Sequence, residues 1–448
     1  MKKIVLFTVV SLFVLLLSSC EPDTPPPHVP LKFSSDHNHF FYDTLDATFY
    51  TLDKKSATTI TFSAQNVATP SLLIDINGTL FPMAVSGSSA SITIPLDTVF
   101  IPKDTTHTIV SYATYDNTTL DSLTLYSVPS DTATIVDPYV PYAWQYGYGD
   151  SAAMELWDVD IFSSINLFGA WFVTKGNKLK VAIIDEDFDV THKDLKGSII
   201  DTYNVVTGGT DVSGSGGHGT TVAGHFGAPL NGVGTSGAAP DVQFILIKYG
   251  YNDAQDIAAF EYAKNAGAKI INCSWGDYHV SDAMVAELKS LYDAGITVVF
   301  ASGNDGRSLD DDGINDQSEV TWVLGVGAST AQNDVWSSSN YGDSLEVIAP
   351  GAHVLGLKAT GTGNFTPPGG AVDKNYGFGS GTSYSAPIVS GVAALIQAAN
   401  PSFTPAQIRE RIISTAQKVG KENGANYDSK GFDTKRAYGK IDAGAAVQ

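Results

Sequence analysis

The chain has 448 residues, of which 43% are hydrophobic and 16% are charged, and 47 acidic against 26 basic side chains give it a formal net charge of −21. A negative excess of this size repels phosphate backbones, so we expect no nucleic-acid partner. The chain contains only two cysteines, and disulfide bonds therefore cannot hold its fold together. Its length allows more than one domain and a large buried core.

The N-terminus is typical of an export signal. Lys2 and Lys3 precede an apolar run over residues 4–17, and the run is followed by the string LSSC. This string resembles the lipobox of bacterial lipoproteins, which implies a signal peptide over residues 1–19 and lipidation of Cys20. Several acyl chains on one residue suffice for stable anchoring, so we expect an exported protein held on a membrane of the cell envelope. A signal cleaved without lipidation and an uncut anchor are the alternatives.

Two segments follow the signal. Residues 20–30 are rich in proline and predict an extended tether. Residues 31–136 are enriched in Thr, Ser, Tyr and Phe, and short alternating runs such as TTITFSA and SITIPL recur between turn signals. This pattern predicts a small β-sandwich of immunoglobulin or fibronectin type.

Residues 137–448 predict an α/β domain. Strand-like apolar runs such as QFILIKY, KIINCSW and TVVFASG alternate with segments of helical periodicity such as AQDIAAFEYAKNAG and DAMVAELKSLYDAG. Such alternation is typical of a mainly parallel sheet flanked by helices on both faces. Cys273 ends one of the apolar runs, and we expect it to be a small core residue rather than a nucleophile.

Three short motifs in this domain supply a carboxylate, an imidazole and a hydroxyl. Asp185 ends the strand-like run VAIID, whereas His218 in GHGTTVAG and Ser383 in GTSYSAP each begin a helical pattern. A serine hydroxyl needs a histidine to accept its proton, and the histidine needs a carboxylate to fix its tautomer. The three residue types, in the chain order Asp, His, Ser, therefore indicate acyl-transfer chemistry.

Each motif also has an ordinary structural explanation. Asp185 alone could cap a strand end, and Ser383 alone could cap a helix. Gly214, Gly216 and Gly219 match the G-x-G-x-x-G pattern of dinucleotide-binding loops, although no clear strand leads into them and a histidine inside the loop would crowd a pyrophosphate. The chain contains no G-x-S-x-G, so an esterase-type nucleophile elbow is not supported.

Taken together, the motifs resemble those of subtilisin-like serine proteases, and the resemblance extends over residues 137–448. It implies a subtilisin-like three-layer fold and a serine endopeptidase in which Ser383 attacks a peptide carbonyl, His218 transfers the proton and Asp185 orients His218. Asn304, in VVFASGNDG, would hold the oxyanion together with the Ser383 amide. The substrate is then a protein or peptide, and no organic cofactor is required. An inert subtilase-fold lipoprotein that acts as a binding module is the alternative.

The resemblance also implies the walls of a substrate cleft that pairs with an extended peptide through backbone hydrogen bonds. These walls are formed by two segments, Ser274, Trp275 and Gly276 in one and Ala301, Ser302 and Gly303 in the other. The indole of Trp275 either shapes a side-chain pocket of this cleft or belongs to the core.

The chain departs from the family pattern immediately after Asp185. The family commonly has a small polar residue and a glycine there, whereas this chain has Glu186 and Asp187. Adjacent carboxylates repel one another, and a residue other than glycine restricts the turn. We expect Glu186 and Asp187 to face solvent or to bind a cation, with Asp185 still orienting His218.

The acidic loop LDDDGINDQSE is a candidate calcium site, because it gathers carboxylate and amide oxygens around a glycine. The candidate ligands are Asp310, Asp312, Asn315 and Asp316. The loop resembles half of a calcium-binding loop but lacks the full spacing and the terminal bidentate glutamate. It is therefore either a structural calcium site or a solvated acidic turn.

Overall fold

A computed structural model describes the strands between residues 32 and 130, and residues 165–448 except 172, 251, 278, 311–315, 367–370 and 421–422. The predicted signal peptide, Cys20 and the predicted tether lie outside the described residues. Within the described part of the chain, no helix is both long enough and apolar enough to span a membrane.

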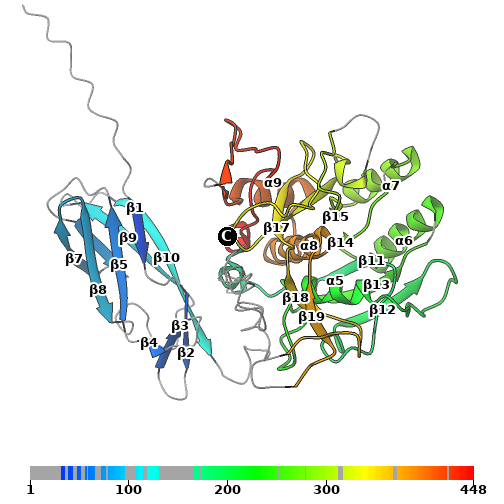
Figure 1. The fold of residues 1–448 in the computed structure, drawn as a ribbon, viewed down its shortest axis with the longest axis horizontal. Coiled ribbons are helices and arrows are strands. Elements are labelled where there is room, and N and C mark those ends of the chain that lie inside the picture. The colour runs from blue at the N-terminus through cyan, green and yellow to red at the C-terminus, as the bar shows by residue number, and fades with distance from the viewer. Residues whose placement is uncertain are drawn as a thin grey trace, which may run out of the picture. The chain divides into compact units, whose positions relative to one another are not determined.

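The described residues of the N-terminal region form β-strands (Figure 1). Six of them are neighbours in the order β1-β5-β8-β7-β6-β9, and every described pairing among these six is antiparallel. A further set pairs β2 with β10 in parallel, and β2 with β3 and β3 with β4 antiparallel. The bounds are β1 Lys32–Ser35, β2 His39–Asp43, β3 Thr48–Thr51, β4 Ser56–Ala57, β5 Thr59–Gln65, β6 Leu72–Ile76, β7 Thr79–Ser86, β8 Ser89–Pro95, β9 His107–Thr114 and β10 Thr119–Ser130.

Phe62 on β5, Ile74 on β6 and Ile94 on β8 are buried in this region. Phe62 and Ile94 stand between small or polar neighbours on their strands, as expected for a sheet with one face packed on a core. The antiparallel β region is therefore confirmed, while its packing as a two-layer sandwich stays a prediction.

The C-terminal region is built on a seven-stranded parallel sheet in the order β12-β13-β11-β14-β15-β16-β17. The strands are β11 Lys180–Asp185, β12 Ile199–Asn204, β13 Gln243–Lys248, β14 Ile270–Cys273, β15 Thr297–Ala301, β16 Val323–Ser329 and β17 Val347–Pro350. A separate antiparallel pair joins β18 Val354–Leu357 to β19 Tyr376–Gly379. The predicted α/β fold is confirmed.

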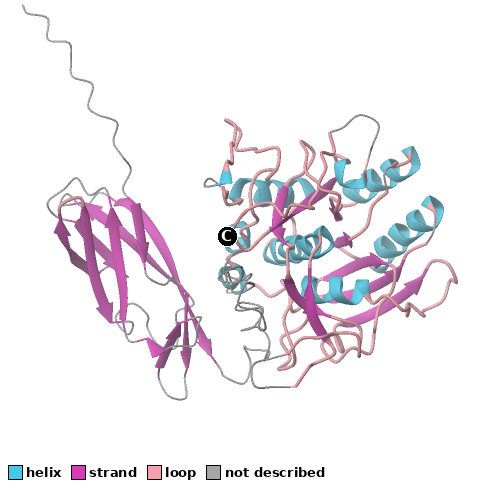
Figure 2. Cartoon of the chain, in the orientation of Figure 1, coloured by secondary structure: helices cyan, strands magenta, loops and turns pink. Residues whose placement is uncertain are grey.

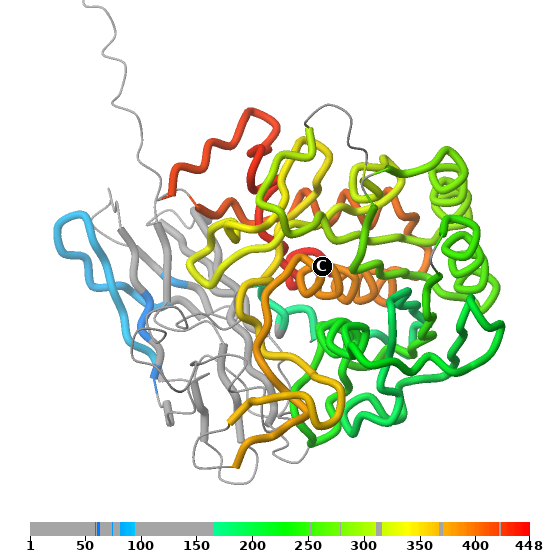
Figure 3. The backbone as a smooth tube through the Cα atoms, turned by 45° about the vertical axis from the view of Figure 1, so that its right-hand side comes forward, coloured from blue at the N-terminus to red at the C-terminus, as the bar shows by residue number. Residues whose placement is uncertain are grey.

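Helices cover both faces of the sheet (Figure 2). They are α4 Leu167–Trp171, α5 His218–Gly227, α6 Asp253–Ala266, α7 Asp282–Asp293, α8 Thr382–Ala399, α9 Pro405–Thr415 and α10 Ala443–Val447, with a short 3₁₀ helix η2 at Gln317–Glu319. The long helix α8, orange in Figure 3, packs on β14, β15, β16 and β17.

Strand β11 shows how the sequence divides between the two faces. Val181 and Ile183 belong to one buried cluster, together with residues of α5 and α8. Ala182 and Ile184 belong to a second buried cluster, together with residues of α6 and α7. Because successive side chains of a strand point to opposite faces, a continuous apolar run is what a sheet covered on both sides requires. Cys273, at the end of β14, lies in the second cluster and is fully buried, as predicted.

Candidate active site

Asp185 is the last residue of β11, which lies inside the sheet between β13 and β14. The chain moves from β11 to β12 on one side and later to β14 on the other, so the carboxyl end of β11 lies at a point where the strand order reverses. Active sites of open α/β sheets collect at such points. Asp185 is only 1% exposed, and its Oδ1 accepts a hydrogen bond from the Glu186 amide at 2.9 Å.

His218 is the first residue of α5, and its Nδ1 lies 2.8 Å from Oδ1 of Asp185. Burial lowers the pKa of His218, but the charge of Asp185 and the hydrogen bond to it outweigh burial, and the exposed Glu186 adds to their effect, so that the pKa is raised overall. The charge of Lys358 opposes this rise. The carboxylate thus fixes the ring and stabilises its protonated form.

Ser383 is the second residue of α8, whose cap residue Gly381 forms no side-chain hydrogen bond to the helix. The Ser383 hydroxyl donates to the backbone carbonyl of Ser274 at 3.2 Å, and the Ser274 hydroxyl donates to the carbonyl of Ser383 at 2.9 Å. The ring of the adjacent Tyr384 lies 6.4 Å from the ring of His218, centroid to centroid. The starts of α5 and α8 are therefore neighbours, which brings all three residues of the predicted triad to one edge of the sheet.

Asn304 follows β15, and its side chain is held by the residue that precedes Ser383. Its Oδ1 accepts hydrogen bonds from the Thr382 amide at 2.8 Å and from the Thr382 hydroxyl at 3.0 Å. This fixes the orientation of the carboxamide, so that Nδ2 is the atom left to donate. A Cβ built on Gly381 would lie 3.8 Å from Nδ2 of Asn304 and 3.7 Å from the Ser383 amide nitrogen. Two hydrogen-bond donors therefore border the same space beside Gly381.

Thr382 is a residue that the sequence analysis did not single out. It is fully buried, and besides its bonds to Asn304 its hydroxyl accepts from the Gly303 amide at 3.2 Å. The only signal in the sequence is its place next to Ser383, because the contact with Asn304 joins segments 78 positions apart.

The two predicted cleft walls lie at the carboxyl ends of β14 and β15, which are adjacent parallel strands. Carboxyl ends of adjacent parallel strands meet at the same edge of a sheet, so the two segments border the region of Ser383. The indole of Trp275 points into the core: its Nε1 donates to the carbonyl of Ile184 at 2.8 Å, and its ring packs against Phe300 and Tyr249. This placement favours the core role of the indole over a role in a side-chain pocket.

Of the two acidic residues after Asp185, only Glu186 faces solvent, and the expectation that Asp187 also faces solvent is wrong. Glu186 is exposed, as predicted. Asp187 is only 5% exposed, and its carboxylate accepts hydrogen bonds from the amides of Gly216 at 2.8 Å and Gly217 at 2.5 Å. The glycine loop before His218 folds over this carboxylate, and that contact cannot be inferred from the residues adjacent to Asp187 in the sequence.

The described part of the candidate calcium loop uses its carboxylates for backbone contacts. Asp316 caps η2 by accepting from the Ser318 amide at 2.9 Å, and Asp310 accepts from the Asp343 amide at 2.8 Å. Among the described residues no group of three or more acidic, histidine or cysteine side chains is arranged to hold a metal ion. Asp312 and Asn315 lie outside the described residues, so the calcium site stays a prediction.

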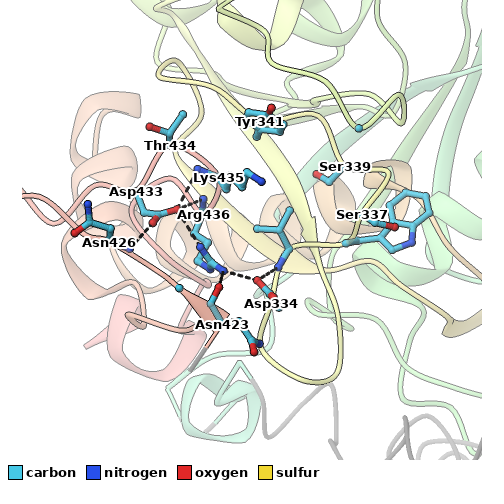
Figure 4. A pocket seen from close by; sticks show the side chains of 14 residues that line it. Asp334, Ser337, Ser339, Tyr341, Asn423, Asn426, Asp433, Thr434, Lys435 and Arg436 are labelled. Atoms are coloured by element: carbon cyan, nitrogen blue, oxygen red, sulfur yellow. Dashed lines mark hydrogen bonds and ion pairs between the residues drawn. The ribbon is translucent and has the colours of Figure 1, made fainter. Parts of the chain in front are cut away.

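A separate cavity of about 490 Å³ is lined by Gly306 and by residues of two loops, 334–341 and 423–436 (Figure 4). The buried Arg436 donates to Oδ1 of Asp334 at 2.6 Å and to the carbonyl of Asn423 at 3.1 Å, and it also pairs with Asp433. The residues of the predicted triad do not line this cavity. It is thus distinct from the substrate cleft predicted beside Ser383.

A buried carboxylate paired with an imidazole, beside a serine at a helix start, is typical of serine hydrolases. Residues 176–439 match the model of the subtilase family. The chain belongs to this family.

Three relatives illustrate the likeness. The chain is 34% identical over 286 residues to a thermophilic serine proteinase of Bacillus sp. (strain AK1), covering 62% of this chain and 64% of that protein. It is 33% identical over 251 residues to subtilisin DY of Bacillus licheniformis, covering 55% of this chain and 86% of that protein. The crystal structure of fervidolysin from Fervidobacterium pennivorans, a keratinolytic enzyme related to subtilisin, superposes with a TM-score of 0.55 at 27% identity, covering 67% of this chain and 46% of that chain. The chain spans less than two thirds of the length of the first and third of these proteins, and all three likenesses support serine protease activity.

Proposed function

We propose that this chain is a serine endopeptidase that hydrolyses peptide bonds of proteins through an acyl-enzyme on Ser383. The observation that carries the proposal is the 2.8 Å contact between Oδ1 of Asp185 and Nδ1 of His218. A bond at Nδ1 makes Nε2 the basic nitrogen of the ring, and Nε2 is the atom that accepts the serine proton in this chemistry.

In the proposed reaction the Ser383 hydroxyl leaves the Ser274 carbonyl, turns toward His218 and attacks the substrate carbonyl carbon as Nε2 takes its proton. The negative charge that develops on the carbonyl oxygen is stabilised by Nδ2 of Asn304 and by the Ser383 amide, at the positive end of α8. The protonated imidazole then gives its proton to the leaving amine, which breaks the peptide bond. Water then attacks the ester carbonyl while Nε2 of His218 takes its proton, and the bond to Ser383 breaks as the imidazole returns that proton to the serine oxygen.

The peptide substrate would bind in extended form between the segments Ser274–Gly276 and Ala301–Gly303. Two features support this placement: both segments leave adjacent parallel strands, and both are tied to the start of α8. Ser274 exchanges hydrogen bonds with Ser383, and the Gly303 amide donates to Thr382. Backbone pairing of this kind is independent of side-chain identity, which suits cleavage of diverse proteins.

We further propose export and lipid anchoring at Cys20, on the basis of the N-terminal sequence alone. The mass of the mature protein tests this: an N-terminal peptide that begins at residue 20 and carries acyl chains is expected. An unmodified Cys20 peptide would exclude the anchor.

Replacement of the nucleophile tests the catalytic proposal. Ser383→Ala is expected to abolish casein hydrolysis and labelling by a fluorophosphonate, because it removes the hydroxyl that forms the proposed acyl-enzyme. Ser380→Ala is the matched control. Ser380 lies three positions before the nucleophile, and its hydroxyl accepts a hydrogen bond from the His353 amide at 2.7 Å. Activity should persist in this variant. Equal labelling of wild type and Ser383→Ala would refute the proposal. Intact casein and an unlabelled, folded wild type would instead favour the inert binding protein.

A further inference from the structure

Asp187 holds the backbone of the loop that leads into α5. Its two carboxylate oxygens accept from consecutive amides, Gly216 at 2.8 Å and Gly217 at 2.5 Å, and Gly217 is the residue immediately before His218. Gly217 has φ +71° and no side chain, so α5 begins without a side-chain cap of its own. A carboxylate at a helix N-terminus forms charge-assisted hydrogen bonds and is favoured by the helix dipole. Asp187 therefore fixes the two backbone amides that immediately precede this helix.

The glycines of the loop make room for this carboxylate. A Cβ on Gly214 would come within 2.2 Å of Oδ2 of Asp187, and a Cβ on Gly219 within 2.5 Å of the Asp187 carbonyl oxygen. Both distances are shorter than real contacts allow, so larger residues would push the loop off Asp187. The G-x-G-x-x-G pattern that resembled a dinucleotide loop is thus explained by close packing around Asp187.

The same short segment contacts α5 at two further points. Oδ1 of Asp185 binds the His218 ring at 2.8 Å, and the Asp189 amide donates to the Thr220 hydroxyl at 2.8 Å. Residues 185, 187 and 189 therefore fix the ring of His218, the backbone before it and the helical turn after it. The position of the imidazole relative to Asp185 is set by one continuous stretch of chain.

We propose that Asp187 is a positioning residue for His218: by binding the Gly216 and Gly217 amides it holds the imidazole where it meets both Asp185 and Ser383. This inference rests on the proposed function. Asp187 is buried, and it acts through the backbone that carries His218. The acidic residue found where the family commonly has glycine is in this way part of the catalytic geometry of this chain.

Asp187→Asn in the full chain tests the inference. Asparagine keeps one carbonyl acceptor, while its amino group would face the second amide proton, so one of the two hydrogen bonds is lost. A misplacement of about 1 Å can cost roughly 100-fold in rate, and we expect kcat to fall about tenfold in Asp187→Asn and further in Asp187→Ala. KM for a peptide amide should stay within about twofold, because the cleft walls are held by contacts that do not involve Asp187.

The rate is measured per active site titrated with a fluorophosphonate, at a pH well above the acid limb of activity. A purely structural role would reduce the number of titratable sites and leave kcat per site unchanged, which would overturn the proposal. Asp211→Asn is the matched control, because Asp211 is an exposed carboxylate of the same loop that accepts from the Ser213 amide at 2.9 Å and from the Ser213 hydroxyl at 2.6 Å. Its kcat per site should equal that of wild type.

Hydrogen exchange provides a second test, which needs neither an active enzyme nor a substitution at Asp187. In the Ser383→Ala chain, the amides of Gly216 and Gly217 should exchange at least about 100-fold more slowly than in an unfolded peptide, because both are bonded to a buried carboxylate. Exchange at the rate of an unfolded peptide would overturn the inference. If wild type fails to cleave casein, the proposed function fails while this test still decides whether Asp187 holds the loop.

Discussion

Thr382 should contribute to catalysis through Asn304, and a double-mutant cycle can measure that link. Asn304→Leu removes the Nδ2 donor, and loss of one oxyanion donor typically costs about 100- to 1,000-fold in kcat, a range measured on a subtilisin. Thr382→Val keeps the shape and the backbone amide of residue 382 but removes the hydroxyl that donates to Oδ1 of Asn304 at 3.0 Å. The amide bond to Oδ1 at 2.8 Å remains, so the carboxamide is held by one hydrogen bond in place of two.

The expected loss of kcat in Thr382→Val follows from the loss of one of the two hydrogen bonds to Oδ1 of Asn304. One neutral hydrogen bond contributes about 1 kcal/mol, which corresponds to roughly a fivefold loss of kcat in Thr382→Val. In the Asn304→Leu background no carboxamide remains to be oriented, and the further loss should be less than about twofold. The Gly303 amide loses its acceptor in both backgrounds, so this contribution cancels in the comparison.

The assay is hydrolysis of a chromogenic peptide amide at saturating substrate, per titrated active site, for wild type, both single variants and the double variant. A non-additive cycle of this size supports the role of Thr382 in orienting Asn304. If Thr382→Val lowers kcat by the same factor in both backgrounds, the hydroxyl acts elsewhere and the described oxyanion geometry is wrong.

Two further predictions concern pH. Glu186→Gln removes a charge that helps to raise the pKa of His218, so the acid limb of kcat/KM should move to lower pH with the plateau unchanged; an unmoved limb would contradict this electrostatic account. Burial raises the pKa of Glu346 to about 7, against the opposing charge of Arg409, so its contribution to stability is present below pH 4.5 and is lost as the pH rises through 7. The test compares two proteins in the Ser383→Ala background, one with Glu346 and one with Glu346→Gln. Between pH 4.5 and 8, the free energy of unfolding measured with urea should fall by about 3 kcal/mol more in the protein with Glu346. A difference between the two proteins that does not change with pH would refute the assignment.

The sequence was sufficient for the parts of this protein that depend on local pattern. The apolar run that ends at Asp185 predicted a buried strand with a carboxylate at its end, and the helical pattern after His218 predicted a helix start. The covered parallel sheet followed from the alternation of such segments. These features are set by residues a few positions apart, whose periodicity decides between strand and helix.

The features that the sequence could not provide all depend on contacts between distant segments. The role of Asp187 depends on amides 29 and 30 positions later, and that of Thr382 on a carboxamide 78 positions earlier. Every residue except proline has a backbone amide, so the sequence does not indicate which side chain will accept a hydrogen bond from a given amide. The direction of the Trp275 indole could not be predicted for the same reason, because it depends on which strands are neighbours in the sheet.

The central claim is that His218, oriented by Asp185, activates Ser383. The most direct measurement is the mass and location of the fluorophosphonate adduct in wild type and in His218→Ala, with circular dichroism to show that both are folded. We expect a single adduct on the peptide that contains Ser383 in wild type, and at most a trace of it in His218→Ala. An adduct on another residue, or equal labelling of Ser383 without the imidazole, would contradict the account.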